Sequence, residues 1–434
     1  MEGSWLPAII LMALFFLLLV FGLWIGVALI LVGWIGLHFF TTVPAGKILG
    51  VSLWNTLNNW PLTCLPLFIF MGEVLSRGRL AEQLFSGLAP WVCRLPGRLL
   101  HVNVLGCALF AAISGSSAAT CATIGKITLP EFKRLNYNEE LSIGSIAGSG
   151  TLGFMIPPSI VMIIYGVLAD VSIGKLFMAG IIPGFLMAAI FMGYILIRGF
   201  LNPSLTPTPA SYTWRDRYRA LPQLLPILLL IGVVLGTIYA GVATPTEAAA
   251  IGVVGALLLA AFTKTLGWEM LKGALKGSTV TSCMMCLIVM GATYFSTAMS
   301  YLGIPQRSVA AVAQLGLPPY AVIGALSLLY LILGCLMDSG SMIVITLPFA
   351  IPIIKLAGFD LVWFGIYLVI MSELGQITPP VGFNLFVLQN VTKKPIGYVT
   401  RVTIPFMLLL LLSALIITLV PDLPLWLPNQ MITR

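Results

Sequence analysis

Long apolar runs separated by short polar segments dominate the chain. Crossing about 30 Å of hydrocarbon takes roughly 20 apolar residues. Runs of about that length predict ordinary membrane-spanning helices at 5–22, 24–41, 60–76, 181–199, 221–239, 242–263, 277–300 and 402–420. Hydrophobic residues form 59% of the 434 residues and charged residues only 8%. A water-facing globule could not bury so much apolar surface, so the pattern predicts an all-α polytopic membrane protein.

Two further apolar segments, 98–132 and 319–356, are interrupted near their middle by a turn rich in Ser and Gly. The first turn reads SGSS from Ser114, and the second reads DSGS from Asp338. Irregular backbone at membrane depth is tolerated only where protein or a water-filled cavity satisfies its polar groups. Each segment is therefore predicted to be a re-entrant hairpin.

A Pro-Pro pair interrupts the apolar span after each hairpin, at 140–168 and at 360–391. Proline lacks the amide donor, and the residue before it avoids helical backbone. Each span is therefore predicted to part into two half-helices. Because hairpin and broken span occur twice in the same order, the sequence indicates an internal repeat.

This repeat divides the chain into five parts. They are N-terminal scaffold spans at 1–59, a first repeat at 60–200, a polar cytoplasmic linker at 201–219, central scaffold spans at 220–275 and a second repeat at 276–434. With the hairpins counted as non-crossing, an odd number of crossings separates the two repeats, so the second copy is expected to be inverted. Amphipathic segments at 79–94 and 305–316 are expected to lie in the membrane interface.

The basic residues favour one orientation in the bilayer. In this topology, 17 of the 22 Lys and Arg residues fall on one face. The other face holds Lys47, Lys175, Arg307, Lys355 and Arg434. Cytoplasmic loops carry the excess of basic residues, so the first face is predicted to be cytoplasmic and both termini outside. This distribution explains the net charge of +8 without nucleic-acid binding.

Inverted repeats with broken helices are typical of secondary transporters, which bind substrate and coupling ion near the midplane. Helix N-termini favour anions there, whereas unwound carbonyls coordinate cations. A site rich in Ser, Gly and Thr suits a hard monovalent cation, because a transition metal would need His or Cys. The sequence lacks HExxH, GxSxG and Walker-type phrases, so neither an enzyme, ATP hydrolysis nor an organic cofactor is expected.

Several long motifs carry a family resemblance. They are SGSSAAT (114–120), AGSGTLGFMIPPSIVMIIY (147–165), GIIPG (180–184), ATPTEAAA (243–250) and GQITPPVGFN (375–384). In these motifs and in their order, the chain resembles the large membrane subunit of tripartite ATP-independent periplasmic (TRAP) transporters.

The resemblance implies an elevator-type secondary transporter driven by a sodium gradient. Its first sodium site would fall on Ser114, Ser117, Gly153, Ile156 and Pro158. Its second would fall on Gly340, Gly375, Thr378 and Val381. Substrate would lie between the hairpin tips, where the candidates by proximity are Ser116, Ser149, Ser341 and Asn384.

The resemblance also implies partners and a location. The chain would act in a bacterial inner membrane with a small four-span subunit and a periplasmic substrate-binding protein that captures an organic acid. Candidate substrates include four-carbon dicarboxylates, sugar acids, sialic acids and keto acids. Because the chain begins without a four-span extension, the small subunit is expected to be a separate polypeptide.

Other interpretations remain open at this stage. A stand-alone carboxylate or anion symporter of the same architecture is the main alternative, and uptake without a soluble partner would distinguish it. An ion channel would need a continuous polar pore. Asp338 could influence an ion or cap a helix, and Glu373 could be linked to a proton, because ionisable groups at membrane depth are costly and usually functional or paired.

Overall fold

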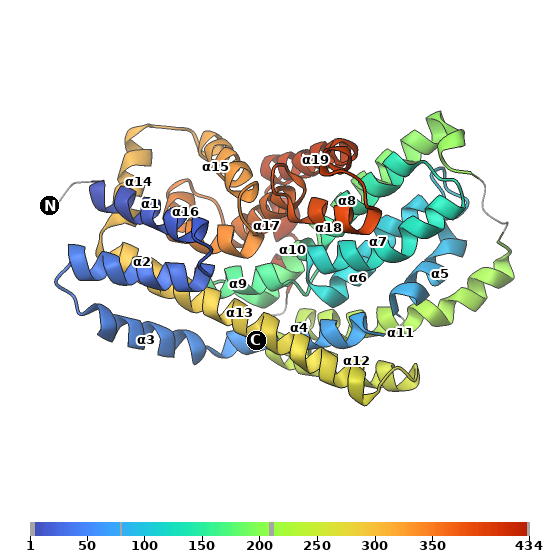
Figure 1. Ribbon diagram of the computed structural model, residues 1–434, viewed down its shortest axis with the longest axis horizontal. Coiled ribbons are helices and arrows are strands. Elements are labelled where there is room, and N and C mark those ends of the chain that lie inside the picture. Colours follow the sequence, from blue (N-terminus) through green and yellow to red (C-terminus); the bar gives the residue numbers. More distant parts are fainter. Residues whose placement is uncertain (1–4, 79, 208–211, 432–434) are drawn as a thin grey trace.

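The computed structural model describes residues 5–78, 80–207 and 212–431, and every regular element within them is a helix (Figure 1). Within these described ranges, seven helical segments are long and apolar enough to cross a membrane. They are Glu139–Ala169, Ile173–Leu201, Trp214–Tyr239, Pro245–Phe262, Trp268–Tyr301, Ser339–Leu356 and Ile396–Leu419. The prediction of an all-helical polytopic protein is confirmed.

The second and third N-terminal helices pack against one long helix, and the first packs against the second. The three N-terminal helices are α1 (Leu6–Val20), α2 (Ile25–Phe40) and α3 (Ala45–Leu57), and the long helix is α13 (Trp268–Tyr301) (Figure 1). A Cβ on Gly291 of α13 would clash with the carbonyl oxygen of Gly26 in α2, so only glycine permits this approach. At 1.5 Å per residue, α1 and α2 are each about 23 Å long, short of the roughly 30 Å hydrocarbon layer.

A second group of helices runs along the lower edge of the view in Figure 1. It comprises η1 (Trp60–Thr63), α4 (Cys64–Ser76), α5 (Leu80–Val92), α11 (Trp214–Tyr239) and α12 (Pro245–Phe262). Trp214 of α11 stacks with two guanidinium groups, that of Arg217 at 4.4 Å and that of Arg94 at 5.8 Å from the ring centroid. The buried Arg217 also donates to the carbonyl oxygen of Pro90, which fastens α5 to α11.

Two four-helix sets follow the same order. The first is α6 (Leu100–Ser114), α7 (Ser117–Arg134), α8 (Glu139–Met155) and α9 (Ile160–Ala169), with lengths of 15, 18, 17 and 10 residues. The second is α15 (Pro319–Gly334), α16 (Ser339–Leu356), α17 (Leu361–Ile377) and α18 (Phe383–Thr392), with lengths of 16, 18, 17 and 10 residues. In both sets the Pro-Pro pair lies between the third and fourth helices.

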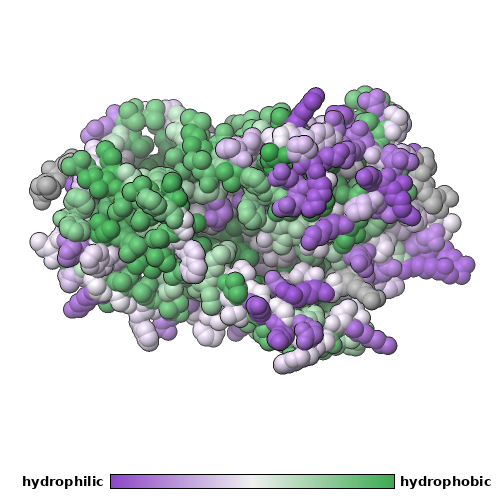
Figure 2. Space-filling model, in the orientation of Figure 1, coloured by the Kyte–Doolittle hydropathy of each residue, from purple (hydrophilic) through white to green (hydrophobic). Residues whose placement is uncertain are grey.

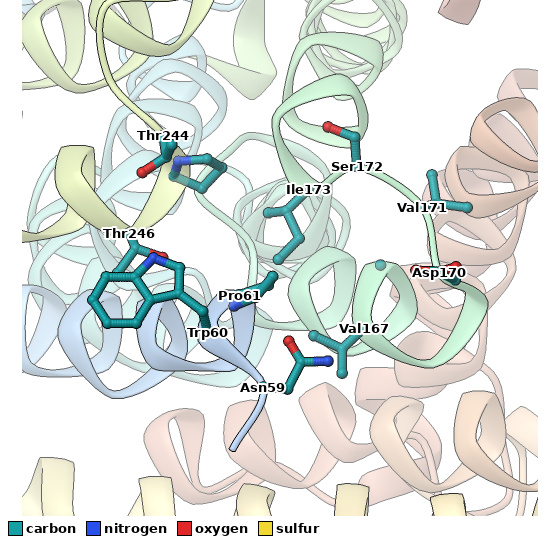
Figure 3. Close-up of a pocket in the computed structure, with 12 residues that line it drawn as sticks. Asn59, Trp60, Pro61, Val167, Asp170, Val171, Ser172, Ile173, Thr244 and Thr246 are labelled. Carbon is teal, nitrogen blue, oxygen red and sulfur yellow. The ribbon is translucent and has the colours of Figure 1, made fainter. Parts of the chain in front are cut away.

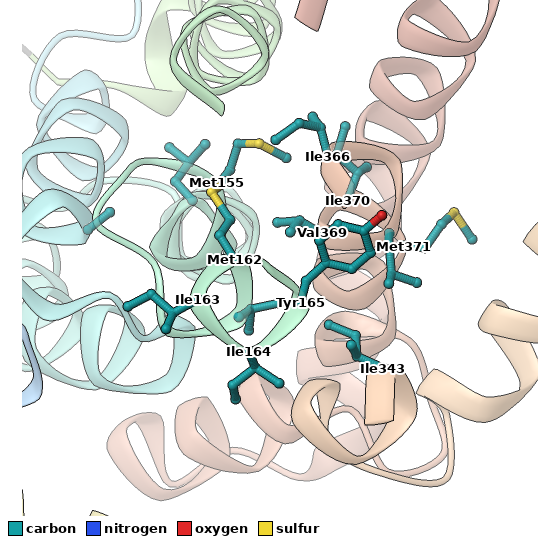
Figure 4. Packing of buried hydrophobic residues seen from close by; sticks show 14 of the residues in the cluster. Met155, Met162, Ile163, Ile164, Tyr165, Ile343, Ile366, Val369, Ile370 and Met371 are labelled. Atoms are coloured by element: carbon teal, nitrogen blue, oxygen red, sulfur yellow. The ribbon is translucent and has the colours of Figure 1, made fainter. Parts of the chain in front are cut away.

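The helix before each Pro-Pro pair forms the centre of the molecule. Every residue of α17 from Trp363 to Ile377 is buried. Figure 4 shows α17 side chains such as Ile366 and Ile370 facing Met162 and Tyr165 of α9. The hydroxyl of Tyr165 also donates to the carbonyl oxygen of Leu361 at 2.6 Å. The two four-helix sets therefore share one apolar core.

The remaining helices surround this core. They are α10 (Ile173–Leu201), η2 (Pro203–Leu205), α14 (Ile304–Gln314), α19 (Ile396–Leu419), α20 (Asp422–Leu425) and η3 (Pro428–Gln430). Figure 2 shows an apolar surface over α1 and α2 on the left, and hydrophilic residues gathered over α7, α8 and α18 on the right. An apolar surface of this extent fits contact with lipid.

The polar linker is shorter in the structure than its composition suggests. Helix α10 continues to Leu201, and α11 begins at Trp214, inside the predicted linker. The side chains and backbones of Thr213 and Asp216 bond reciprocally in a capping box, which starts α11 early. Positions 208–211 of the predicted linker lie outside the described residues.

Candidate ion and substrate site

The first hairpin turns between α6, which ends at Ser114, and α7, which begins at Ser117. Gly115 has left-handed backbone (φ 57°), which glycine adopts without steric cost. The side chain of Ser116 caps α7. Thr120 Oγ1 lies 2.8 Å from Ser114 Oγ and donates to the carbonyl oxygen of Ser116 at 2.8 Å. The tip is therefore a turn lined with hydroxyl groups. Thr120 of α7 holds this turn in place through its contacts with Ser114 and Ser116.

This tip packs directly on the break between α8 and α9. A Cβ on Gly153 would lie 2.6 Å from both the carbonyl carbon and the oxygen of Ser116. A Cβ on Gly115 would lie 2.9 Å from the carbonyl oxygen of Pro158. The backbone of the tip is thus in direct contact with the backbone of the break. The residues predicted for the first sodium site border this one region: Ser114, Ser117, Gly153, Ile156 and Pro158.

In the second hairpin, Asp338 caps α16. Its carboxylate accepts from the amides of Gly340 at 3.0 Å and Ser341 at 3.3 Å, and from the Ser341 hydroxyl. Carboxylates at this position satisfy amides that the helix leaves unpaired and interact favourably with its dipole. Of the two roles considered for Asp338, the structure therefore shows helix capping.

Side chains and close glycine contacts fasten the second tip to α17. The Ser339 hydroxyl donates to the carbonyl oxygen of Ser372 at 3.2 Å and accepts from Gln376 Nε2 at 2.9 Å. A Cβ on Gly375 would lie 2.7 Å from the Cα of Gly334 in α15. The α15–α16 hairpin thus rests closely on α17.

The second Pro-Pro pair lies where α17 gives way to α18. Thr378 Oγ1 donates to the carbonyl oxygen of Leu374 at 2.6 Å. The amide of Val381 donates to the carbonyl oxygen of Cys335, beside the second tip, at 3.3 Å. Thr378 and Val381, both predicted for the second sodium site, therefore lie at this break, and Gly375 lies one turn before it.

Besides the bond from Tyr165 to Leu361, a second hydrogen bond joins the two four-helix sets. Asn384 Nδ2 donates to Ser117 Oγ at 2.7 Å, and both side chains are fully buried. Asn384 lies in the first turn of α18, directly after the second break, and Ser117 begins α7, directly after the first tip. A candidate substrate residue of the second half thus contacts a candidate sodium residue of the first.

Helix ends set the electrostatics around this bond. The N-termini of α7 and α18 meet there, and such ends carry partial positive charge and amides without intrahelical partners. The carboxyl ends of α6 and α8 lie at the first tip and first break, where carbonyl oxygens carry partial negative charge. The region can therefore stabilise an anion beside Asn384 and a cation beside Gly153.

Several buried polar atoms here have no hydrogen-bond partner within the described part of the chain. They are Ser149 Oγ, Asn384 Oδ1 and both carboxyl oxygens of Glu373. The backbone of Phe154 and Met155, at the end of α8, lies beside the Glu373 carboxyl. Burying a polar group without a partner costs free energy, so these atoms are available to a ligand.

The donor atoms suit a hard cation. Across 5–78, 80–207 and 212–431, no group of three or more His, Cys, Asp or Glu side chains is placed to hold a metal. Hydroxyl and carbonyl oxygens, the free Asn384 Oδ1 and the carboxyl oxygens of Asp338 and Glu373 are the donors that the tips and breaks offer. Such oxygens fit sodium and do not fit a transition metal.

Only two of the four candidate substrate residues lie close together in the structure. Ser116 and Asn384 lie close together at the first tip, because Ser117 follows Ser116 and bonds Asn384. Ser341 instead bonds Asp338, and Ser149 lies one turn before Gly153 in α8. The sequence-based selection missed Thr120 and Gln376, although each lies inside a quoted motif and close to another polar member of it.

Two cavities open beside α9. One of about 300 Å³ lies between η1, the α9–α10 connection and the start of α12, with Asn59, Trp60, Asp170 and Thr244 in its wall (Figure 3). The other, of about 160 Å³, lies between α9, α13 and α16. Val167 borders both. None of the predicted sodium or substrate residues lines either cavity, so the cavities mark a loosely packed boundary between α9 and its neighbours.

Comparison with known proteins identifies the family. Residues 12–423 match the family described as tripartite ATP-independent periplasmic transporter, DctM component. The chain belongs to this family. It is therefore a TRAP transporter large permease subunit and a multi-pass membrane protein, and its membership in a transporter family agrees with the prediction that it is not an enzyme.

Individual relatives of this TRAP permease differ in the substrate for which they are named. The C4-dicarboxylate TRAP transporter large permease protein DctM of Pseudomonas aeruginosa is 35% identical, over 88% of this chain and 90% of the relative. The sialic acid TRAP transporter large permease protein SiaM of Vibrio cholerae is 29% identical, over 86% of this chain and 87% of the relative.

A third relative is longer. The isethionate TRAP transporter permease protein DctMQ of Oleidesulfovibrio alaskensis is 32% identical over 97% of this TRAP permease, which spans 66% of it. Among solved structures, that of Neisseria gonorrhoeae MtrF superimposes with a TM-score of 0.65 at 14% identity, covering 97% of this chain and 94% of MtrF. That likeness shows a shared polytopic helical fold.

Proposed function

We propose that this TRAP permease is the large membrane subunit of a sodium-coupled, binding-protein-dependent importer of an organic acid. The observation that carries the proposal is the buried bond between Asn384 and Ser117, which joins the first hairpin tip to the second helix break. Around it, helix N-termini favour a carboxylate, and hydroxyl and carbonyl oxygens favour sodium.

The proposed sodium positions are those that border the tips and breaks. Ser114, Ser117, Gly153, Ile156 and Pro158 would hold one ion. Gly340, Gly375, Thr378 and Val381 would hold the other. The sodium gradient supplies the driving force, while the chain's own residues bind and orient the carboxylate beside Ser116 and Asn384, with Ser149 and Ser341 as further candidates.

We propose an elevator motion, in which the two four-helix sets slide together against the remaining helices. The matching helix lengths of the two sets support an internal repeat, and the inverted orientation follows from the predicted topology. The cavities beside α9 lie between these sets and helices α12 and α13, where loose packing would permit sliding.

We further propose that the protein lies in a bacterial inner membrane with a small four-span subunit and a periplasmic binding protein. The family match and the longer DctMQ relative support the small subunit. The binding protein would capture the substrate outside and pass it to the permease.

Uptake by purified protein in liposomes tests this proposal. The assay contains the small subunit and offers a panel of C4-dicarboxylates, sialic acids, sugar acids and keto acids. Each acid is tested with and without a sodium gradient and with and without the binding protein. Uptake that needs both the sodium gradient and the binding protein supports the proposal. Uptake by the membrane part alone would instead identify a stand-alone symporter.

Thr378→Ala is expected to lower the apparent sodium affinity of uptake about tenfold, because it removes a hydroxyl from the proposed second site. Thr378→Ser keeps the hydroxyl and is expected to retain near-normal affinity. The measurement is initial uptake rate against sodium concentration, normalised to protein in the liposomes. Equal sodium dependence in Thr378→Ala and the original protein would contradict this site.

A further inference from the structure

A small cavity lies away from the ion and substrate site, where three helix ends meet. It has a volume of about 90 Å³ and lies at the start of α8, the end of α10 and the start of α19. Glu140 and Leu141 contribute from α8, Tyr194 and Arg198 from α10, and Arg401 from α19. All of these positions lie near the end of the molecule that the distribution of basic residues predicts to be cytoplasmic.

The inner wall of this cavity is rigid. Phe406 of α19 lies there with only 1% of its surface exposed. Its ring meets that of Tyr194 edge-on with centroids 5.3 Å apart. A Cβ on Gly148 would lie 2.6 Å from Phe406 Cδ1, so α8 holds the ring tightly. Side chains at the mouth are therefore arranged around a fixed aromatic surface.

The cavity holds two guanidinium groups that make no ion pair within the described residues. Arg198 Nη1 donates to the hydroxyl of Tyr194 at 3.0 Å, which orients it, whereas Arg401 is exposed. Glu140 offsets one positive charge but is itself exposed at the first turn of α8. The cavity thus keeps a positive balance of side-chain charges, which the N-termini of α8 and α19 increase and the C-terminus of α10 reduces.

A neighbouring basic residue, Lys394, already forms an ion pair. Lys394 Nζ bonds the carboxylate of Glu139 at 2.9 Å, and that hydrogen bond raises the pKa of Lys394. Arg198 and Arg401 are therefore the groups left to receive an anion, and planar guanidinium groups match the geometry of phosphate oxygens.

Apolar side chains continue from the cavity along both helices. On the bilayer side of Arg198 in α10, Leu196 and Ile197 are 39% and 56% exposed, and on α19, Ile404 and Leu408 are 43% and 55% exposed. In a bilayer these side chains contact acyl chains. A basic cavity at a helix end with apolar side chains beside it is complementary to a phospholipid.

We propose that this cavity binds the phosphate-bearing headgroup of an anionic phospholipid, with Arg198 and Arg401 on the phosphate oxygens and acyl chains along α10 and α19. The site would bind lipid where the α8, α10 and α19 ends meet, independently of the sodium positions. It rests on the bilayer placement of the chain and not on the identity of the transported acid.

Lipid titration of the delipidated, detergent-purified full-length protein, followed by native mass spectrometry, tests the site. The lipids are phosphatidylglycerol and phosphatidylcholine, and inorganic phosphate is added as a competitor. R198Q/R401Q is expected to bind phosphatidylglycerol about 30-fold more weakly, from the loss of two charge contacts. E140Q is expected to bind it severalfold more tightly.

R215Q/R219Q is the matched control, because it also removes two positive charges but lies at the start of α11. It is expected to bind phosphatidylglycerol as the original protein does. An equal loss in this control, or equal binding of phosphatidylcholine, would overturn the proposal. Displacement of phosphatidylglycerol by millimolar phosphate would show a free-anion site instead. None of these outcomes depends on uptake, so they leave the proposed transport function untouched.

Discussion

Gly153→Ala is expected to lower the apparent sodium affinity of uptake by about 10- to 100-fold. The added Cβ would lie 2.6 Å from the carbonyl group of Ser116 and 2.7 Å from the Cα of Ser117. These are backbone atoms, which cannot rotate away as a flexible side chain could. Overpacking of this kind costs about 1–3 kcal/mol, and here it would separate the first tip from the first break. Sodium-dependent uptake in liposomes measures the effect.

Gly193→Ala is the matched control for this substitution. Gly193 also lies within a helix, α10, but a Cβ there would meet no atom within 4 Å. Alanine also has a higher helix propensity than glycine, so this variant should fold at least as well and keep normal sodium dependence. If Gly153→Ala also kept normal sodium dependence, the contact between tip and break would have no role in ion binding.

Asn384→Ala is expected to reduce uptake at least tenfold. It removes the donor that satisfies the fully buried Ser117 hydroxyl, and an unpaired buried group costs about 1–3 kcal/mol. It also removes the side-chain amide that is proposed to face the carboxylate group of the substrate. A double-mutant cycle with Ser117→Ala should give a coupling free energy of about 0.5–3 kcal/mol for uptake.

A second buried pair of the same two residue types provides the control. Asn103 Nδ2 donates to Ser145 Oγ at 2.8 Å, between α6 and α8. Asn103→Ala should lower the melting temperature in detergent about as much as Asn384→Ala, yet leave the dependence of uptake on sodium and substrate unchanged. If both variants altered only thermal stability, the Ser117–Asn384 bond would be a packing contact without a transport role.

The helix breaks could be anticipated from sequence because their cause is local. Proline has no amide donor wherever the chain goes, so each Pro-Pro pair stands between helices. The apolar runs at 277–300 and 402–420 similarly match α13 and α19, although both helices begin before them. Helix α3 was not anticipated, because its 13 residues mix Lys47 and Asn55 with exposed apolar side chains and form no continuous apolar run.

The candidate site was harder to predict because its contacts are distant in sequence. Ser117 and Asn384 are 267 positions apart, and nothing in one sequence states that their side chains meet. The family resemblance suggested Ser117 as a sodium ligand, whereas Asn384 was a substrate candidate only by proximity to the hairpin tips. Likewise, the approach of Gly334 to Gly375 depends on how α15 crosses α17, which composition and periodicity do not determine.

The attachment of α5 to α11 limits how the hairpin after it can move. Arg94 is held against Trp214 of α11, whereas a Cβ on Gly199 of α10 would clash with the amide nitrogen of Gly97. Between these two anchored points lie only Leu95 and Pro96, whose backbone offers roughly three soft torsions. So short a tether cannot absorb a displacement of many ångströms. Because α6 begins only three residues after Gly97, large travel of the α6–α9 set past α10 and α11 requires this segment to leave Gly199 of α10 and Trp214 of α11.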